Sequence, residues 1–82
     1  MRYFDVATYK QFSLQKMIKV NLFDTEHFFC DLYCLKIGQS QKPHTHQGAD
    51  KIYYILEGKG TFLIGDEENI LQPGQIVLAQ SG

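Results

Sequence analysis

Turn-forming residues recur at short intervals along this chain, and they leave room between them only for short strands. The segments that they separate predict strands at about residues 15–23, 27–37, 50–57, 60–64, 69–71 and 75–80. Connections this short join antiparallel neighbours, because a parallel crossover needs about a dozen residues or more. The pattern therefore predicts an all-β, antiparallel fold. The turn signals are Asp24-Thr25, Gly38 to Lys42, Gln47-Gly48, Gly58-Lys59-Gly60, Gly65-Asp66 and Gln72-Pro73-Gly74.

The first fifteen residues are the part of the chain in which a helix is compatible with the sequence. Val6, Tyr9 and Phe12 have helical spacing over a turn or two, and a strand at Tyr3 to Val6 fits equally well. The sequence leaves both alternatives open. No internal repeat, low-complexity tract or linker divides the 82 residues, so we expect a single domain over residues 1–82.

Several predicted strands are apolar on both faces. In the run Ile52-Tyr53-Tyr54-Ile55-Leu56, neither alternate set of side chains is polar, whereas a sheet with one face in water would alternate. One face can fill the interior of a barrel, and the other then needs cover from a second sheet or a partner subunit. We therefore expect self-association, most simply as a two-fold homodimer, and the strand near Ile76 to Gln80 offers an open edge.

Charge and hydropathy exclude two classes of partner. Eight Lys and Arg residues oppose nine Asp and Glu residues, so a net charge of −1 creates no field that would draw the chain to nucleic acid. The longest apolar runs have only a few residues, far fewer than the ~20 that cross a bilayer. We expect no nucleic-acid partner and no membrane insertion.

The two cysteines indicate a reducing compartment. Cys30 and Cys34 lie four residues apart, which on a strand places them on one face with Cα atoms ~13 Å apart. A disulfide cannot span that distance, so both are predicted to be free thiols. Residues 1–20 also lack the apolar run and cleavage site of a signal peptide. The sequence therefore predicts a cytoplasmic protein.

His44 and His46 are the residues that point to specific chemistry. Pro43 before them favours extended backbone at the start of a strand. On a strand, residues two apart share a face with Cα atoms ~6.6 Å apart, so both imidazoles can reach one metal ion. On a helix the same side chains would point apart. Two histidines in this spacing also occur as ordinary polar residues beside a turn, so the interpretation depends on their surroundings.

The segment from Gly38 to Gly58 resembles the first signature of the cupin family. That signature reads G-x5-H-x-H-x3,4-E-x6-G. Gly38, His44, His46 and Gly58 stand at its fixed positions with the longer of its two spacings. The run Tyr-Tyr-Ile-Leu-Glu-Gly-Lys-Gly at its end is typical of the small single-domain members of the family.

A second cupin signature, G-x5-P-x-G-x2-H-x3-N, begins at Gly74 and occupies residues 74–82. Gln80 stands where this signature has Pro, and Gly82 stands at its second Gly. Its His would lie three positions beyond Gly82. The resemblance therefore implies a cupin β-barrel, also called a double-stranded β-helix or jelly roll, whose C-terminal strands are missing from this chain.

The resemblance also implies a set of metal ligands. In the family, two His and one Glu of the first signature act with the His of the second, and the two His are here His44 and His46. The Glu position falls on Lys51, whose ammonium cannot bind a dication unless it loses a proton. Asp50 can substitute if the extra residue of this spacing forms a β-bulge that turns the carboxylate inward. Otherwise Asp50 ends a solvated turn, and Gln47 is a weaker candidate ligand.

The function implied by the resemblance is the binding of a divalent transition metal, Fe, Mn, Ni or Zn, beside a small polar molecule. The parent protein would be an isomerase, a dioxygenase or a decarboxylase. An alternative is a non-catalytic module that binds a sugar or another small molecule, which Lys51 in the Glu position favours. In a third interpretation the histidines only fill the barrel mouth. With one ligand missing, the 82-residue chain is expected to bind metal weakly.

Tyr53 and Lys51 are the candidate contacts for the small molecule, although aromatic residues at alternating positions are more often part of a core. The other polar residues indicate no chemistry. His27 is interpreted as an ordinary strand-end histidine, and the three acidic residues at 66–68 as solvated residues of a hairpin turn.

Overall fold

The computed structural model of the protein describes residues 3–41 and 48–81. Contacts group the chain into two compact units, Met1–Lys42 and Pro43–Gly82. The single domain expected from the sequence stays a prediction. In chain order the elements are α1 (Val6–Tyr9), β1 (Ile18–Asp24), β2 (Phe29–Cys34), β3 (Lys51–Tyr54), β4 (Gly60–Ile64), β5 (Glu67–Leu71) and β6 (Ile76–Ala79).

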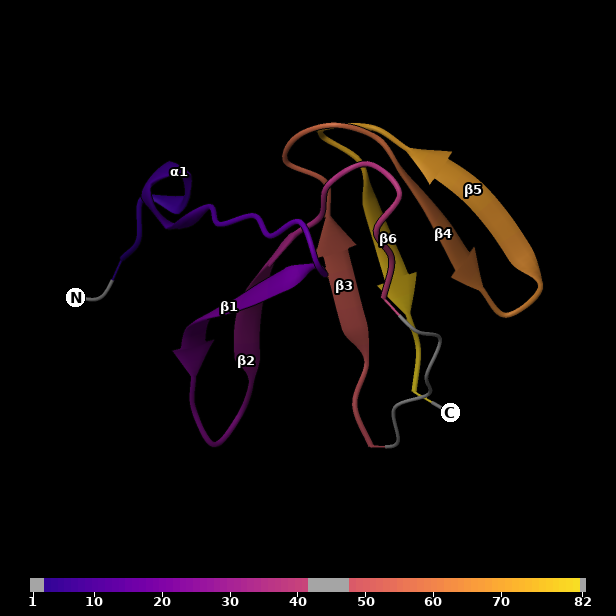
Figure 1. Cartoon of the computed structure of the whole chain (residues 1–82). Helices are drawn as coiled ribbons and strands as arrows, with labels where there is room; N and C mark the ends of the chain where they lie inside the picture. The colour runs from indigo at the N-terminus through magenta and orange to yellow at the C-terminus, as the bar shows by residue number, and fades with distance from the viewer. Residues whose placement is uncertain (1–2, 42–47, 82) are drawn as a thin grey trace. The chain divides into compact units, whose positions relative to one another are not determined.

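β1 and β2 form an antiparallel hairpin in the first unit (Figure 1). The ladder pairs Ile18 with Cys34 and Val20 with Leu32, and a register shift follows Asn21. The paired residues share one face of the hairpin, because side chains alternate along a strand. On this face Leu32 is 9% exposed and Cys34 is 3% exposed, and they are the buried hydrophobic residues of the described chain. The core of the first unit therefore lies on this face.

The opposite face of the β1–β2 hairpin is polar. Asn21 Nδ2 donates to Asp31 Oδ1 at 2.8 Å across the ladder and to the Phe23 carbonyl at 3.1 Å. At the tip, the Thr25 hydroxyl oxygen accepts hydrogen bonds from the next backbone N–H groups, those of His27 at 3.1 Å and of Phe28 at 3.2 Å. Such side-chain bonds to the backbone replace the ladder and so end the strand.

A single turn of helix precedes β1. Asp5 caps α1, and its Oδ1 accepts from the Ala7 N–H at 3.3 Å. The Phe4 ring makes edge-on contacts with Tyr9 and Phe23, with ring centroids 5.1 and 4.9 Å apart. Of the two alternatives that the sequence leaves open here, the helical turn is the one that forms, because Asp5 supplies a cap.

Two turns with the same Gly-Gln pair occur, one in each unit. They span residues 36–39, after β2, and residues 72–75, before β6. In each turn the glutamine N–H donates to the carbonyl of the first residue, at 3.0 and 3.1 Å, and the glutamine Oε1 accepts from the N–H of that residue at 2.8 Å. Gly38 and Gly74 have φ of +88° and +89°, the left-handed backbone that a type II turn requires at its third residue.

The second unit contains two antiparallel strand pairs, β3 with β6 and β4 with β5 (Figure 1). The first ladder runs from Lys51 opposite Ala79 to Tyr54 opposite Ile76. β4 and β5 are joined by a two-residue loop whose first residue, Gly65, has φ +62°. A glycine with positive φ at this place is typical of a type II′ turn, whose twist matches that of the strands it joins.

Glu67 and Glu68 belong to β5, whereas the sequence predicted a solvated turn over residues 66–68. Glu67 pairs with Ile64 and Glu68 with Leu63, and both acidic side chains are exposed. The prediction is wrong at these two residues, because a type II′ loop needs only two residues and pairing resumes directly after it.

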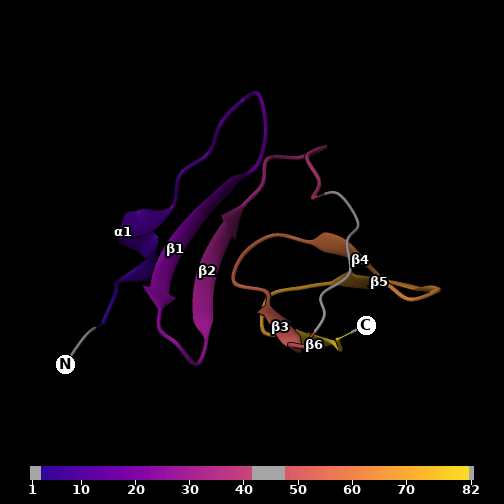
Figure 2. The ribbon, with the colours of Figure 1, turned by 90° about the horizontal axis from the view of Figure 1, so that it is seen from below.

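The two strand pairs of the second unit form two layers (Figure 2). Tyr53 on β3 packs against Phe62 on β4, with ring centroids 5.5 Å apart. Because side chains alternate along a strand, Lys51 shares the face of Tyr53, whereas Ile52 and Tyr54 point to the opposite face. The face with Tyr53 is half-buried, and the opposite face remains exposed.

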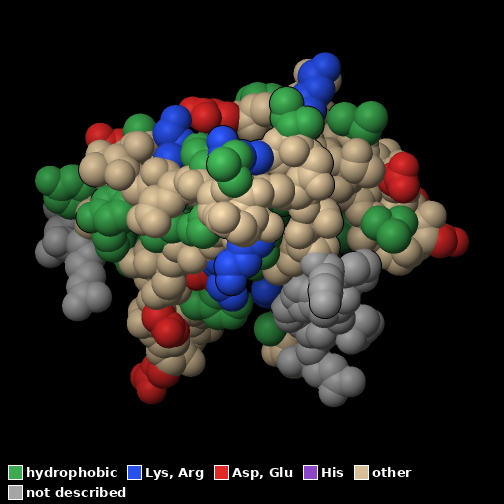
Figure 3. Space-filling model, viewed as in Figure 1, with side chains coloured by type: hydrophobic (Ala, Val, Ile, Leu, Met, Phe, Trp, Pro, Cys, Tyr) green, Lys and Arg blue, Asp and Glu red, His purple; other side chains and the backbone are tan. Residues whose placement is uncertain are grey.

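The all-β, antiparallel class predicted from the sequence is confirmed, although most strands are shorter than the predicted segments. Cys30 and Cys34 are free thiols, as their spacing predicts. Within residues 3–41 and 48–81, no helix has the length and apolar character needed to cross a bilayer. Many large hydrophobic side chains remain at the surface, and Figure 3 shows such side chains among charged ones.

Candidate functional site

Asp50 is the predicted metal ligand whose position is known, since His44, His46 and Gln47 lie outside the described residues. It stands immediately before β3, and its side chain is exposed. Its Oδ1 accepts a hydrogen bond from the Ser81 N–H at 2.8 Å. This bond joins the start of β3 to the residues that follow β6, so one carboxylate oxygen of Asp50 has a structural role.

The predicted small-molecule contacts, Lys51 and Tyr53, lie on the same face of β3. They pair with Ala79 and Val77 of β6, and both side chains are half-buried. The ladder pairs residue for residue from Lys51 onward, so β3 itself contains no bulge. The Tyr53 ring has a structural partner in Phe62 of β4. A role for either residue in binding a small molecule stays a prediction.

A pocket of about 300 Å³ lies in the second unit, lined by residues of β4, β5 and β6 and of the turn before β6. Its wall is mainly apolar and includes Phe62, Ile64 and Val77. A mainly apolar wall with a few polar groups that orient the ligand is usual for small-molecule sites, and this volume is at the lower end of their size range. The polar side chains that line it are Glu67, Asn69 and Gln75.

Glu67 and Asn69 are pocket residues that the sequence analysis missed. They pair with Ile64 and Phe62 of β4, so all four side chains share one face of the hairpin. The alternation of residues 67–71 could have identified them, if the hairpin loop had been predicted to end at its second residue, Asp66. Glu67, which the sequence placed in a solvated turn, is instead a polar residue in the wall of this pocket.

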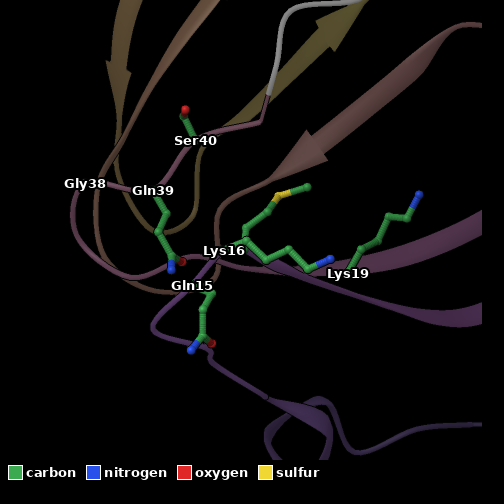
Figure 4. A pocket seen from close by; sticks show the side chains of 7 residues that line it. Gln15, Lys16, Lys19, Gly38, Gln39 and Ser40 are labelled. Atoms are coloured by element: carbon green, nitrogen blue, oxygen red, sulfur yellow. The ribbon is translucent and has the colours of Figure 1, made fainter.

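Another pocket, of about 470 Å³, lies in the first unit between the segment before β1 and the turn after β2 (Figure 4). Lys16 and Lys19 give it positive charge, and Figure 4 shows Gln39 extending toward the segment before β1. Gln39 Nε2 donates to the Ser13 carbonyl at 2.6 Å, while its Oε1 completes the turn. Both polar atoms of Gln39 thus hold the chain together, and the described lining contains no His, Cys, Asp or Glu.

The residues in the described ranges do not by themselves form a metal site, since no three His, Cys, Asp or Glu side chains lie close enough together there. The predicted ligand set still fits a divalent transition metal by its chemistry. Two imidazole nitrogens and a carboxylate oxygen are donors that Fe, Mn, Ni and Zn accept. Asp50 contributes to this fit, because its carboxylate is exposed and its hydrogen bond to Ser81 engages Oδ1 alone within the described part of the chain.

Comparisons with known proteins agree with the resemblance drawn from the two signatures. Residues 31–82 match the family described as the cupin domain. The crystal structure of the protein TT1209 from Thermus thermophilus is similar to this chain, with 40% sequence identity and a TM-score of 0.95. The similarity covers 100% of this chain and 78% of that one. Among curated proteins, the search found no match.

Proposed function

Because this chain belongs to the cupin family, we propose that it binds a divalent transition metal together with a small molecule. The observation that carries the proposal is the order of donors in the sequence, in which His44 and His46 are followed by Asp50 directly before β3. These residues lie within the range matched by the family. The pocket of the second unit supports the small-molecule part.

His44, His46 and Asp50 would hold the metal in this proposal. Asp50 is preferred to Lys51 as the third donor, because Lys51 carries an ammonium group and its side chain is half-buried within the β3 ladder. Three protein donors leave coordination positions open. A metal bound there would polarise a carbonyl of the small molecule or orient an acidic group.

The pocket of the second unit would bind the body of the small molecule. Phe62, Ile64 and Val77 offer apolar contact. The Glu67 carboxylate can accept hydrogen bonds, and the Asn69 amide can both donate and accept them. We therefore propose a ligand with a compact apolar body and hydroxyl or amino groups, and Lys51 and Tyr53 are further proposed contacts.

Two classes of activity fit this proposal. In the first, the metal supports an isomerase, dioxygenase or decarboxylase reaction. In the second, the protein binds a sugar or another small molecule without turnover, which is favoured by the ammonium group of Lys51 at the position of the family's Glu. A cytoplasmic location remains part of the proposal, supported by the free thiols of Cys30 and Cys34.

Titration of Zn²⁺ or Ni²⁺ into the 82-residue chain tests the metal part. His44→Ala should weaken binding about tenfold or more, because it removes a donor. His27→Ala is the matched control, because His27 lies at the β1–β2 tip with a side chain that is 84% exposed. Binding should fade below about pH 6.5, where ordinary imidazoles become protonated and cannot ligate. Equal affinity of the parent chain and both variants would show that His44 is not a ligand.

Two substitutions at Asp50 separate its structural role from its proposed role as a ligand. Asp50→Asn keeps an oxygen that can accept from the Ser81 N–H but loses the charge, whereas Asp50→Ala loses both. If the carboxylate binds metal, both variants should weaken binding by a similar factor. Parent-like affinity in Asp50→Asn would show that Asp50 serves only the hydrogen bond to Ser81.

A screen of sugars, hydroxy acids and amino acids against the metal-loaded protein tests the small-molecule part. Glu67→Gln should weaken the binding of any hit, while Glu68→Gln, on the opposite face of β5, should not. Turnover of a hit would identify an enzyme, and binding without turnover would identify a binding module. Equal effects of the two substitutions would show that the pocket is not the binding site.

A further inference from the structure

We propose that the pocket of the first unit binds a phosphate group, as free phosphate or as part of a small phosphate ester. This pocket lies between the segment before β1 and the turn after β2, and we call it the Lys16 pocket. Lys16 and Lys19 would hold the phosphate. The inference goes beyond the proposed function, because both lysines precede residues 31–82, the range that matches the cupin domain.

Both lysines line one pocket because the chain bends directly before β1. Residues 14–16 form a bend, and β1 begins at Ile18. On a continuous strand, side chains three residues apart would point to opposite faces. Lys16 lies in the bend instead, and so it lines the same pocket as Lys19 of β1. Figure 4 shows the Lys16 side chain extending toward Lys19. The bend therefore gathers two positive charges in one pocket.

The positive charge of this pocket is not neutralised by carboxylates of the first unit. Neither Lys16 nor Lys19 forms an ion pair in the described part of the chain. Asp31 is the acidic residue closest to Lys19 in the register of the hairpin, and its Oδ1 accepts from Asn21 Nδ2 at 2.8 Å. Two positive charges without a counter-charge favour an anion between them.

Hydrogen bonds fix the walls of the Lys16 pocket. Gln39 Nε2 donates to the Ser13 carbonyl at 2.6 Å, and two bonds with Lys36, at 2.8 and 3.0 Å, close the turn that positions Gln39. Next to Lys16, the Ser13 hydroxyl donates to Gln15 Oε1 at 2.8 Å and accepts from the Gln15 N–H at 3.2 Å. Walls that are already ordered lose little conformational freedom when a ligand binds.

The chemistry of the pocket favours phosphate over a carboxylate. A lysine ammonium is a compact charge with three donors, which can reach oxygens arranged as a tetrahedron. Planar contact with a carboxylate through two parallel hydrogen bonds is instead the geometry of arginine, and no arginine is found in the described lining. A phosphate monoester carries a charge of about −1.5 to −2 at pH 7, which matches two ammonium groups.

The size of the pocket leaves room for more than the phosphate. Its volume of about 470 Å³ lies within the usual range for small-molecule sites. Gly38 lines the pocket without a side chain, Met17 adds an apolar surface, and Ser40 adds a hydroxyl group. A compact organic group attached to the phosphate could therefore be accommodated beside the two lysines.

Titration calorimetry on the metal-free 82-residue chain tests the proposal, with inorganic phosphate, glycerol 3-phosphate and glycerol as probes. We expect saturable binding of the two phosphates and no binding of glycerol, which lacks the charge. Tighter binding of the ester would identify a small molecule as the source of the phosphate, and equal affinity would identify free phosphate. Both results support the proposal. Added NaCl should weaken the binding, because salt screens exposed charges.

Lys16→Gln and Lys19→Gln should each weaken phosphate binding about fivefold or more, because each removes a charged donor. The matched control is Lys59→Gln, which removes the same charge from an exposed residue between β3 and β4. This control should bind phosphate as the parent chain does. Equal losses in all three variants would show that phosphate responds to the overall charge, and the proposal would be wrong.

Ser40→Asp provides an independent test, because it adds a negative charge to the lining without removing either lysine. Ser40 is exposed, so the substitution should leave the fold intact, as circular dichroism can verify. Phosphate binding should fall below detection in this variant. Parent-like affinity would overturn the proposal, as would a parent chain that binds neither phosphate probe or that binds glycerol equally well.

Nuclear magnetic resonance locates the bound phosphate. Addition of glycerol 3-phosphate to the metal-free chain should shift the amide signals of residues 15–19 and 38–40, which contain the pocket lining. Shifts confined to residues 62–78 would place the phosphate in the pocket of the second unit. That result would overturn the assignment to Lys16 and Lys19.

Discussion

The turn over residues 36–39 and the turn over residues 72–75 share a backbone hydrogen bond, a left-handed glycine and a glutamine Oε1 that accepts from the first N–H. They differ in what the glutamine amide nitrogen does. Gln39 Nε2 donates to the Ser13 carbonyl, 26 residues earlier in the chain. Among the described residues, the side-chain hydrogen bond of Gln75 stays within its own turn. The first turn is therefore tied to a distant segment by a side chain. The second is tied to one by its backbone, since the Gly74 N–H donates to the Ile55 carbonyl at 2.9 Å and the Gln75 carbonyl accepts from the Ile55 N–H at 3.0 Å.

The same contrast separates the two units. The first unit buries Leu32 and Cys34, and a side-chain bond between Asn21 and Asp31 crosses its hairpin. The second unit has no buried hydrophobic residue within its described part, residues 48–81. Its strands are held by ladders and turns, and they leave apolar surface exposed. Binding of a metal or a small molecule to the second unit would add to its stability.

The two units should differ most in how much stability is lost when a large side chain is replaced by Ala. Leu32→Ala should lower the free energy of unfolding by about 2–4 kcal/mol, because it leaves a cavity in the core of the first unit. Ile70→Ala should change it by less than about 0.5 kcal/mol, because Ile70 on β5 is 67% exposed. Urea unfolding followed by circular dichroism measures both values. Similar losses at the two sites would remove the contrast.

A smaller difference in stability is expected between substitutions of the two equivalent turn residues, Gln39 and Gln75. Gln39→Ala should lower the free energy of unfolding by about 1–2 kcal/mol, since it removes the bond to Ser13 as well as the bond within the turn. Gln75→Ala should lower it by about 0.5–1 kcal/mol, since it removes the bond within the turn. Thermal unfolding of the two variants under one set of conditions makes the comparison. A larger loss in Gln75→Ala would reverse our account of the two turns.

The smallest expected effect comes from making the first turn more like the second. Ile37 stands where the other turn has Pro73, and its side chain is fully exposed, at 107%. The second residue of a type II turn has φ near the value that proline fixes. Ile37→Pro should therefore raise the free energy of unfolding by about 0.4–1 kcal/mol, by restricting the unfolded chain. A lower unfolding temperature in this variant would show that the backbone at residue 37 does not have that conformation.

Local chemistry explains what could be predicted of the fold. Glycine, proline and aspartate limit the backbone at the turns, so the positions of Gly38, Gly65 and Pro73-Gly74 were sufficient to predict short antiparallel strands. The pairing of β3 with β6 is different, because a whole hairpin separates these strands in the chain. No local pattern specifies which distant strand completes a ladder, and so the sequence could not provide that register.

The candidate site was predictable to a similar extent. Spacing and resemblance pointed to His44, His46 and Asp50, and their role as ligands stays a prediction. The bond from Ser81 to Asp50 could not be foreseen, because it depends on the β3–β6 pairing. Glu67 was within reach of sequence reasoning, since the alternation that places it in the pocket wall needs only the correct length of one loop.

The two-residue loop after β4 also has an evolutionary consequence. Because side chains alternate along a strand, the length of this loop decides which set of β5 residues faces the pocket. If one residue were inserted after Gly65 and the loop kept two residues, β5 would stay paired, but Glu67 and Asn69 would turn to the other face. Asp66 and Glu68 would then take their places opposite Ile64 and Phe62. A single codon at this turn could therefore exchange the polar groups that a ligand meets, while the hydrophobic framework around them stays the same.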